Sequence, residues 1–476
     1  MGKAKSKDKG ISKSSFIAGK NCLLALWNRM HDVKRDANIT NDNHVWNNSA
    51  MRAGNEIGDL AQLYFGGVQK KGNALIKNYI SNIAAAQTKK FIEDGSEIIF
   101  EACAVHAGDK SNCWLDVLRK VPGTDEWDMI EVKNSGSVKP YHKDDLSFQY
   151  YVFKGAGYKI RSCFLMHING KYERQGDLDL SQLFVLEDIT AAVLKKQPEI
   201  EAKVKEEYEA AKLPAAPVVD VGGHCTKPLL CPYKSTCWKN IFNEAAAGPA
   251  QFNAPMLDQF LKKVEYPVYY LDYEAMMPFV PLYNGTKPFQ FIPFQFSLHV
   301  EKAAGAPLIH TDFLHTKSSD PRRAFVERLI AVCGTKGSVM VYNDSFERSR
   351  NKELGLEFPE YKEQLDAISA RMIDLSVPFQ KHWIYEPAQK GSLSIKGVVP
   401  AYTHLSYSGM GVANGEEAAQ AYLAFAQGKL DKTKTEKLWD SLTAYCTLDT
   451  LAMVEIHRAL RRRVYPVEPV SFKPQP

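Results

Sequence analysis

Four cysteines at the two ends of one segment constrain the fold of this chain more than any other feature. Cys22 lies near the N-terminus, and Cys225, Cys231 and Cys237 follow far downstream in a Cys-x5-Cys-x5-Cys pattern. Thiolates gathered from both ends of a segment indicate a metal or iron–sulfur centre that joins those ends. The chain has nine cysteines and no apolar signal segment at its start. This predicts a cytoplasmic protein with thiols or metal ligands instead of a disulfide framework.

Length and composition limit the class of protein. The 476 residues are enough for two or three domains with separate cores. No apolar run approaches the roughly 20 residues that a membrane-spanning helix needs, so we expect no membrane partner. The net charge of +5 is compatible with a polyanionic partner but does not require one.

The first half predicts a small mixed sheet with flanking helices. Apolar and alternating runs predict strands over 97–105, 112–121, 127–133 and 160–168. Helices are expected through most of 15–95, over 144–155 and over 189–212. The order is helix–β–β–β–helix–β, which is typical of the α/β class.

Changes of composition predict the domain boundaries. They divide the chain into a basic disordered tail, a first domain closed by the cysteines, a linker, a second domain and a final tail, at 1–14, 15–244, 245–263, 264–465 and 466–476.

An acid–acid–lysine set lies between the cysteines. Asp116 stands in a predicted strand, and Glu131 and Lys133 are two residues apart in the next one, so their side chains share a face. Carboxylates that hold Mg²⁺ or Mn²⁺ beside a lysine suit the cleavage of phosphodiester bonds. Gln149, in the following helix, extends toward the same edge. Taken alone, a Glu-x-Lys pair is also common as a surface ion pair.

These residues resemble the motifs of the PD-(D/E)XK nuclease superfamily, and above all RecB-like nucleases of the CRISPR-associated type that carry an iron–sulfur cluster. The resemblance implies a restriction-endonuclease-like domain. It implies that Asp116 is the metal aspartate, that Glu131 and Lys133 form the E-x-K pair, and that Gln149 is the glutamine of a Q-x3-Y helix.

The sequence departs from this family at two points. Phe153 stands where the Q-x3-Y motif ends in tyrosine. The family's upstream helix supplies a histidine or glutamate, and here the candidates are Glu56 and Asp59.

The same resemblance implies that Cys22, Cys225, Cys231 and Cys237 hold a [4Fe–4S] cluster. Zinc is the alternative, although structural zinc favours shorter Cys-x2–4-Cys spacings, and unligated thiols are a third interpretation. The remaining cysteines lie in apolar elements and are expected in the core; they are Cys103, Cys113, Cys163, Cys333 and Cys446.

The second half begins a new pattern. Strands are predicted over 268–274, 290–300 and 308–315, then a helix over 322–333 and a short strand over 338–342. Helices follow at 345–355, 359–370, 415–427 and 434–463. Three strands, a helix, a strand and further helices is the element order of a ribonuclease-H-like domain.

Paired polar residues recur in this half. Asp272 and Glu274 are two apart at a strand end and share a face. Tyr445 and Asp449 are four apart on a helix and also share a face. Taken alone, each pair is more often an ordinary surface pattern than part of a site.

In this order the motifs resemble those of DEDD exonucleases with tyrosine in the last motif. The resemblance implies two metal ions held by four acids, with Tyr445 orienting the attacking water; the acids are Asp272, Glu274, Glu347 and Asp449. The family has aspartate where this chain has Glu347, and Asp344 is the substitute ligand. Asp374 and Lys396 are either auxiliary site residues or a buried structural pair.

The two halves together resemble an uncharacterised bacterial family in which such a domain follows a RecB-like nuclease. We therefore expect a metal-dependent nuclease that hydrolyses DNA, as an exonuclease favouring single strands, at two separate sites, in DNA repair or phage defence. Two alternatives stay open. One is a nucleic-acid-binding component with one or both sites inactive, and the other is an RNA-trimming exonuclease acting through the C-terminal domain.

Overall fold

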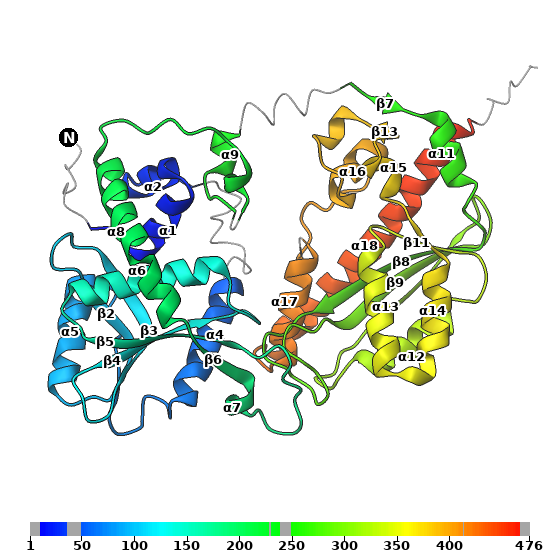
Figure 1. Cartoon of the computed structure of the whole chain (residues 1–476). Helices are drawn as coiled ribbons and strands as arrows, with labels where there is room; N and C mark the ends of the chain where they lie inside the picture. The colour runs from blue at the N-terminus through cyan, green and yellow to red at the C-terminus, as the bar shows by residue number, and fades with distance from the viewer. Residues whose placement is uncertain (1–9, 36–48, 228–229, 239–248, 413, 467–476) are drawn as a thin grey trace, which may run out of the picture. The chain divides into compact units, whose positions relative to one another are not determined.

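The computed structural model describes residues 10–35, 49–227, 230–238, 249–412 and 414–466. The chain forms two compact units, each with its own sheet and helices (Figure 1). The first unit is Met1–Trp238 with Phe279–Phe289, and the second is Lys239–Pro278 with Gln290–Pro476. The predicted α/β class is confirmed. In the described part of the chain, no helix has the length and apolar character to cross a lipid bilayer.

The first unit has a six-stranded mixed sheet whose strands lie side by side in chain order. β1–β2 and β4–β5 pair in parallel, and the other neighbours are antiparallel. The strands are β1 (Asn73–Leu75), β2 (Ile98–Val105), β3 (Asn112–Lys120), β4 (Trp127–Lys133), β5 (Ile160–Ile168) and β6 (Phe184–Asp188). The helices are α1 (Lys13–Asn21), α2 (Leu23–Met30), α4 (Ser49–Tyr64), α5 (Ser81–Glu93), α6 (Pro140–Gly155), α7 (Leu180–Leu183), α8 (Thr190–Lys212), η1 (Gly223–Cys225) and α9 (Lys234–Cys237).

Helices cover both faces of this sheet and fix the direction of its polar residues. On one face, Phe16 of α1 and Phe148 of α6 belong to the same buried cluster as Met129 of β4. On the other face, Ile130 packs with residues of α4 and α7. Because side chains alternate along a strand, Glu131 lies on the same face as Met129 and points toward α1 and α6.

The second unit has a five-stranded sheet in the order β10-β9-β8-β11-β12. β10, β9 and β8 are antiparallel neighbours, whereas β8, β11 and β12 run parallel. The strands are β8 (Val268–Met276), β9 (Ile292–Glu301), β10 (Leu308–Leu314), β11 (Ser338–Val341) and β12 (Met372–Asp374), with a separate pair β7 (Gln251–Phe252) and β13 (Ile384–Tyr385). The helices are α11 (Ala254–Leu261), α12 (Arg322–Val332), α13 (Ser345–Glu357), η2 (Pro359–Tyr361), α14 (Lys362–Ala370), α15 (Val377–Gln380), η3 (Pro387–Gln389), α16 (Ile395–Tyr402), α17 (Gly415–Ala426) and α18 (Lys432–Val464).

The central strand β8 lies between two helical layers. Tyr270 belongs to the core formed with α11, α16 and the long helix α18, which runs along the sheet in red and orange (Figure 1). Leu271 and Tyr273 belong to the opposite core, with α12, α13 and α14. The two-residue period of a strand therefore turns Asp272 and Glu274 toward the α18 side.

Most elements lie where the sequence predicts them. β4 and β5 have the predicted bounds of 127–133 and 160–168, and α8 differs from the predicted helix by one residue. These elements have strong apolar periodicity and clear breaks at their ends, which are the signals that sequence patterns carry best.

The predicted disordered tail over 1–14 is wrong for its last five residues. Ile11 is fully buried, Ser12 caps α1 through the backbone of Ser15, and the helix begins at Lys13. One isoleucine among lysines gives too weak a periodic signal to predict this anchoring, since burial depends on the partner surface. Residues 1–9 lie outside the described part of the chain.

The predicted linker over 245–263 is also wrong in part. It contains α11, which Asn253 caps and which buries Leu257 and Phe260 in the core of the second unit. The Ala- and Pro-containing sequence before the helix resembles a break, but Pro255 lies in the first turn, where proline is well tolerated. Residues 245–248 lie outside the described residues.

Candidate active site

Three carboxylates come together in the second unit. Asp272 and Glu274 extend from β8 and Asp449 extends from α18, and their ligand oxygens all lie within 4.8 Å of one another. Glu274 and Asp449 are buried, whereas Asp272 is half-buried. This spacing suits carboxylate oxygens that share a divalent cation.

Two tyrosines and a lysine surround the Asp449 carboxylate. Tyr407 Oη donates a hydrogen bond to Asp449 Oδ1 at 2.5 Å, and the Tyr445 hydroxyl faces the same carboxylate. Lys396 Nζ lies 4.6 Å from the centroid of the Tyr445 ring and 5.1 Å from that of Tyr407. The positive charge of Lys396 acts on Asp449 and Glu274. The predicted Tyr445–Asp449 pair thus faces the acids, and Lys396 offsets part of their charge.

The acids of this cluster hold protons more tightly than usual. Burial raises the pKa of Asp272 well above its ordinary value, and the nearby charges of Asp449 and Glu274 raise it further. Burial is also the main cause that raises the pKa of Glu274 to about 8 and that of Asp449 above its usual value. Crowded carboxylates keep protons unless a cation replaces them, so this donor set fits a divalent metal ion.

Glu347, the residue at which the motif departs, lies beside the three acids. It extends from the first turn of α13, is buried, and adds to the rise in pKa of both Asp272 and Glu274. Burial raises its own pKa to about 8, and its buried Oε2 has no hydrogen-bond partner among the described residues. Glu347 is therefore available as a further ligand, although it lies outside the set of three.

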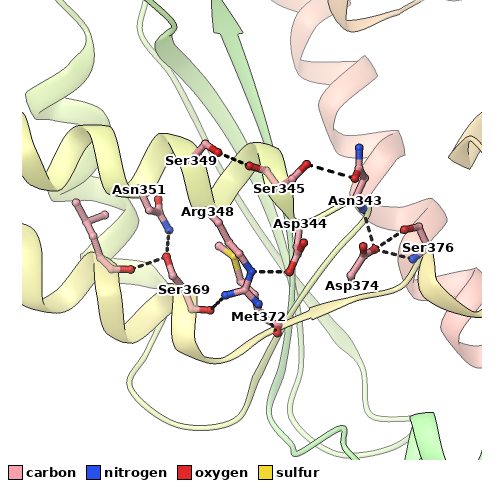
Figure 2. Close-up of polar contacts among 11 residues, drawn as sticks. Asn343, Asp344, Ser345, Arg348, Ser349, Asn351, Ser369, Met372, Asp374 and Ser376 are labelled. Atoms are coloured by element: carbon pink, nitrogen blue, oxygen red, sulfur yellow. Dashed lines mark hydrogen bonds and ion pairs between the residues drawn. The ribbon is translucent and has the colours of Figure 1, made fainter. Parts of the chain in front are cut away.

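Asp344, the substitute ligand, is engaged elsewhere. Its Oδ2 accepts a 2.5 Å hydrogen bond from Arg348 Nε one turn along α13 (Figure 2). The same guanidinium donates to the carbonyl oxygens of Ser369 and Met372. This arrangement leaves Glu347 as the acid that the middle motif contributes.

Asp374 fixes the turn that leads into α13. Figure 2 shows its carboxylate between Asn343 and Ser376. Its Oδ1 accepts from the backbone N–H of Asn343 at 2.9 Å and from both the N–H and the hydroxyl of Ser376, at 2.8 and 2.6 Å. Asn343 has a φ of 70°, in the left-handed region that asparagine tolerates. Asp374 thus holds the turn before the helix that carries Glu347, and its charge adds to the rise in the pKa of Glu347.

Two close approaches at this site are absent from the sequence motifs. Cys446, which we expect as a plain core residue, places its Sγ 3.6 Å from Asp272 Oδ2. A Cβ added to Gly415, at the start of α17, would lie 3.3 Å from Glu274 Oε2. These contacts, like that of Tyr407, bring together residues far apart in the chain and leave no local pattern to detect.

The residues predicted for the first site also meet, in the first unit. Lys133 Nζ donates to Glu131 Oε1 at 2.8 Å, and Gln149 Nε2 donates to Glu131 Oε2 at 2.6 Å. Asp116 Oδ2 accepts from the backbone N–H of Val132 at 2.5 Å. All four predicted side chains thus lie together where α6 packs on β3 and β4.

The pKa values of the two acids of this site shift in opposite directions. Burial raises the pKa of Asp116 well above its usual range, and the charges of Glu131 and Glu101 add to the rise. Burial also opposes the charge of Glu131, but Lys13 and Lys133 outweigh it and hold the pKa of Glu131 below its usual value. The site therefore pairs an aspartate with a raised pKa and a glutamate with a lowered pKa.

Three charged residues of this site are missing from the sequence prediction. Glu101 stands in β2 with a φ of 55°, where it interrupts the pairing with β3 next to Asp116. Asp145, in the first half of α6, pairs with Lys133. Lys13 of α1 donates to Glu131 Oε1 at 2.8 Å. Glu101 lies in a strand that the sequence predicts, but no motif marks it.

The upstream-helix candidates lie on α4. Glu56 is half-buried and Asp59 is exposed. Neither belongs to a set of three close ligand atoms in the described part of the chain. The expected role of this helix in the first site stays a prediction.

The four motif cysteines line one small cavity of about 20 Å³; they are Cys22, Cys225, Cys231 and Cys237. Asn21 Nδ2 donates to the carbonyl oxygen of His224 at 2.7 Å, which ties the end of α1 to the cysteine segment. Among the described residues, no three sulfur atoms lie within 4.8 Å of one another. The kind of centre that these thiols would hold, iron–sulfur or zinc, stays a prediction.

Part of the second unit is similar to a known protein family. Residues 269–394 are similar to a family described as a domain of unknown function, DUF2779. The matched segment includes β8 with Asp272 and Glu274, the middle motif with Glu347, and the turn around Asp374, but ends before α18. None of the curated proteins compared with the chain matches it.

Proposed function

We propose that this chain is a metal-dependent nuclease whose principal site is formed by Asp272, Glu274 and Asp449. The observation that carries the proposal is the approach of these three carboxylates to within 4.8 Å. The sheet order β10-β9-β8-β11-β12, with β9 antiparallel to β8, supports the ribonuclease-H-like arrangement expected from the sequence. The buried Glu347 supplies a fourth acid beside the three.

Each side chain of this site has a chemical role in the proposal. A divalent cation held by the carboxylates would polarise the scissile phosphate and lower the pKa of a water molecule. Tyr445, one helical turn from Asp449, would orient that water. Lys396 provides a positive charge that attracts the phosphate backbone and limits the repulsion from the acids.

The cleavage assay uses labelled single-stranded DNA, double-stranded DNA and RNA with Mn²⁺ or Mg²⁺. We expect wild-type protein to degrade single-stranded DNA and Asp272→Asn to lose most, but not all, of this activity. Degradation of RNA alone would favour the RNA-trimming alternative. Binding without cleavage of any substrate would contradict the proposal and favour a nucleic-acid-binding component.

We propose a second cleavage site at Asp116, Glu131, Lys133 and Gln149. Convergence of Lys133 and Gln149 on the two oxygens of Glu131 supports it. Activity that remains in Asp272→Asn and disappears after an additional Glu131→Gln substitution is the expected result. Loss of all cleavage in Asp272→Asn alone would contradict this second site.

We also propose that the four motif cysteines hold a [4Fe–4S] cluster, because they line one cavity. This centre would join α1 and α2 to the segment after α8 and so close the first unit. All four ligands belong to the first unit, so its loss is expected to affect the Glu131 site before the Asp272 site.

A further inference from the structure

Lys13 reaches the first site from the N-terminal part of the first unit, 118 positions before Glu131. Its Nζ donates to Glu131 Oε1 at 2.8 Å, the same oxygen that accepts from Lys133 Nζ at 2.8 Å. Gln149 occupies the other oxygen at 2.6 Å. The charge of Lys13 also acts on Asp116 and Asp145. One ammonium thus lies among the acids that are expected to hold a divalent ion.

The segment that carries Lys13 is firmly anchored. Asn112 N donates to the carbonyl oxygen of Ile11 at 3.0 Å, and Ile11 is fully buried. Gly10 packs so closely that an added Cβ would lie 1.9 Å from the carbonyl oxygen of Lys110. One turn after Lys13, Phe16 stacks on Phe148 of α6 with ring centroids 4.6 Å apart. The position of Lys13 is therefore set by packing on both sides.

This placement creates competition for one carboxylate. A divalent cation needs the lone pairs of Glu131 and a share of its negative charge, and both are already used by ammonium groups. Lys133 belongs to the predicted E-x-K motif, whereas Lys13 comes from a separate helix. Two positive side chains on Glu131 oppose the binding of a third cation at the same oxygen.

We propose that Lys13 is a built-in cation that occupies the metal position of the Glu131 site, so that Mn²⁺ or Mg²⁺ binds there only when Lys13 leaves Glu131. The inference rests on the proposed second cleavage site. It assigns to α1 the control of metal loading, and it makes the N-terminal segment an inhibitory element of that site.

The test measures Mn²⁺ binding to full-length protein that carries Asp272→Asn and Asp449→Asn, which weaken the other metal site. Free Mn²⁺ is followed by electron paramagnetic resonance. Lys13→Gln is expected to tighten Mn²⁺ binding by about tenfold or more, because it removes one competing charge. Adding Glu131→Gln to that variant is expected to abolish the gain. Unchanged or weaker Mn²⁺ binding in Lys13→Gln would overturn the proposal.

Lys20→Gln is the matched control. Lys20 lies in the last turn of the same helix and pairs with Asp144 and Glu199, away from Glu131. Its substitution is expected to leave Mn²⁺ affinity unchanged, and tighter binding in Lys20→Gln would overturn the assignment to Lys13.

A second variant and a separate assay keep the result interpretable. Lys13→Met keeps the apolar stem of the side chain, and circular dichroism checks that both Lys13 variants fold. Lys13→Met is expected to tighten Mn²⁺ binding as Lys13→Gln does. DNA cleavage by the otherwise wild-type chain is measured in parallel. Tighter Mn²⁺ binding without cleavage would uphold the role of Lys13 and contradict only the nuclease function.

Discussion

Tyr407 Oη donates a 2.5 Å hydrogen bond to Asp449 Oδ1, across 42 positions of the sequence. Tyr407 follows α16 and belongs to none of the predicted motifs, yet it contacts the last acid of the site directly. Burial raises the pKa of Asp449, and the bond from Tyr407 opposes that rise. The hydroxyl therefore favours the charged carboxylate that a metal ion needs.

Tyr407→Phe is expected to move metal binding at this site to higher pH. Without the donor, the pKa of Asp449 rises, so protons compete with the cation over a wider range. The pH dependence of Mn²⁺ affinity measures this change, and we expect its midpoint to rise by about 0.5 to 1 in pH. Tyr402→Phe is the control, because Tyr402 Oη donates to Gln389 instead. Equal profiles for Tyr407→Phe and wild type would contradict this role.

Asp272→Asn is expected to raise the stability of the metal-free protein while removing its stabilisation by metal. The substitution relieves repulsion among buried carboxylates, and a gain of about 1 kcal/mol corresponds to about 2–4 °C in melting temperature. Melting curves with and without Mn²⁺ measure both effects. Asp366→Asn, at an exposed ion pair with Lys362, is the control. It should change neither the metal-free stability nor the stabilisation by Mn²⁺ by more than about 0.5 kcal/mol. A metal-free melting temperature that falls in Asp272→Asn would count against mutual repulsion of the acids.

Glu207 predicts a loss of stability with rising pH. It is fully buried beside Gly19, and neither carboxylate oxygen has a hydrogen-bond partner in the described part of the chain. Burial raises its pKa from the ordinary 4.5 to about 9. Because the folded protein holds this proton more tightly than the unfolded chain, stability is full below about pH 4.5 and declines as pH rises toward 9.

Glu207→Gln keeps the shape of the protonated glutamate side chain but cannot titrate, so it is expected to remove this decline. The melting temperature of the variant minus that of the wild type should grow as pH rises from about 5 to about 8.5. The reason is that the wild-type protein loses about 1.4 kcal/mol of stability for each rise of about one in pH across this range. Glu206→Gln, at the adjacent exposed position, is the control. Parallel pH curves for Glu207→Gln and wild type would exclude a buried neutral acid.

Cys231→Ser is expected to remove the visible absorption of thiolate-bound iron and to lower the melting temperature together. Cys231 lines the cysteine cavity, and serine is a poor ligand for a cluster. Iron content and spectra of anaerobically purified protein measure the change. Cys163→Ser, in the core of β5, is the control and should destabilise without loss of iron. A colourless wild-type protein that contains zinc would refute the cluster.

Local signals are strong enough to predict the secondary structure and the motif residues. The alternation around Asp272–Glu274 and around Glu131–Lys133, and the four-residue spacing of Tyr445 and Asp449, each follow from the period of one element. For the same reason the sheets, the long helix α18 and the faces that carry the acids are predictable.

Other site residues depend on contacts between distant segments. The sequence pattern places Lys13 in a tail. It correctly predicts that Cys446 is buried, but not that its thiol lies beside Asp272. It gives no role to Tyr407, Glu101 and Asp145, because nothing in their neighbours encodes a partner.

The middle motif shows the same limit. Its pattern leaves Asp344 and Glu347 as alternative ligands, since both acids lie near the start of one helix. The pairing of Asp344 with Arg348 leaves Glu347 as the acid beside the site, and this pairing depends on how α13 packs.

The sequence by itself determined which residue types are present and which of them share a face, because strand and helix periods are properties of the local backbone. The tertiary structure alone decided which faces meet. Packing of α18 on β8 brought three acids within 4.8 Å, and packing of α1 on α6 placed the Lys13 ammonium on Glu131. Charges interact through space, so their partners and pKa values follow from packing and not from position along the chain.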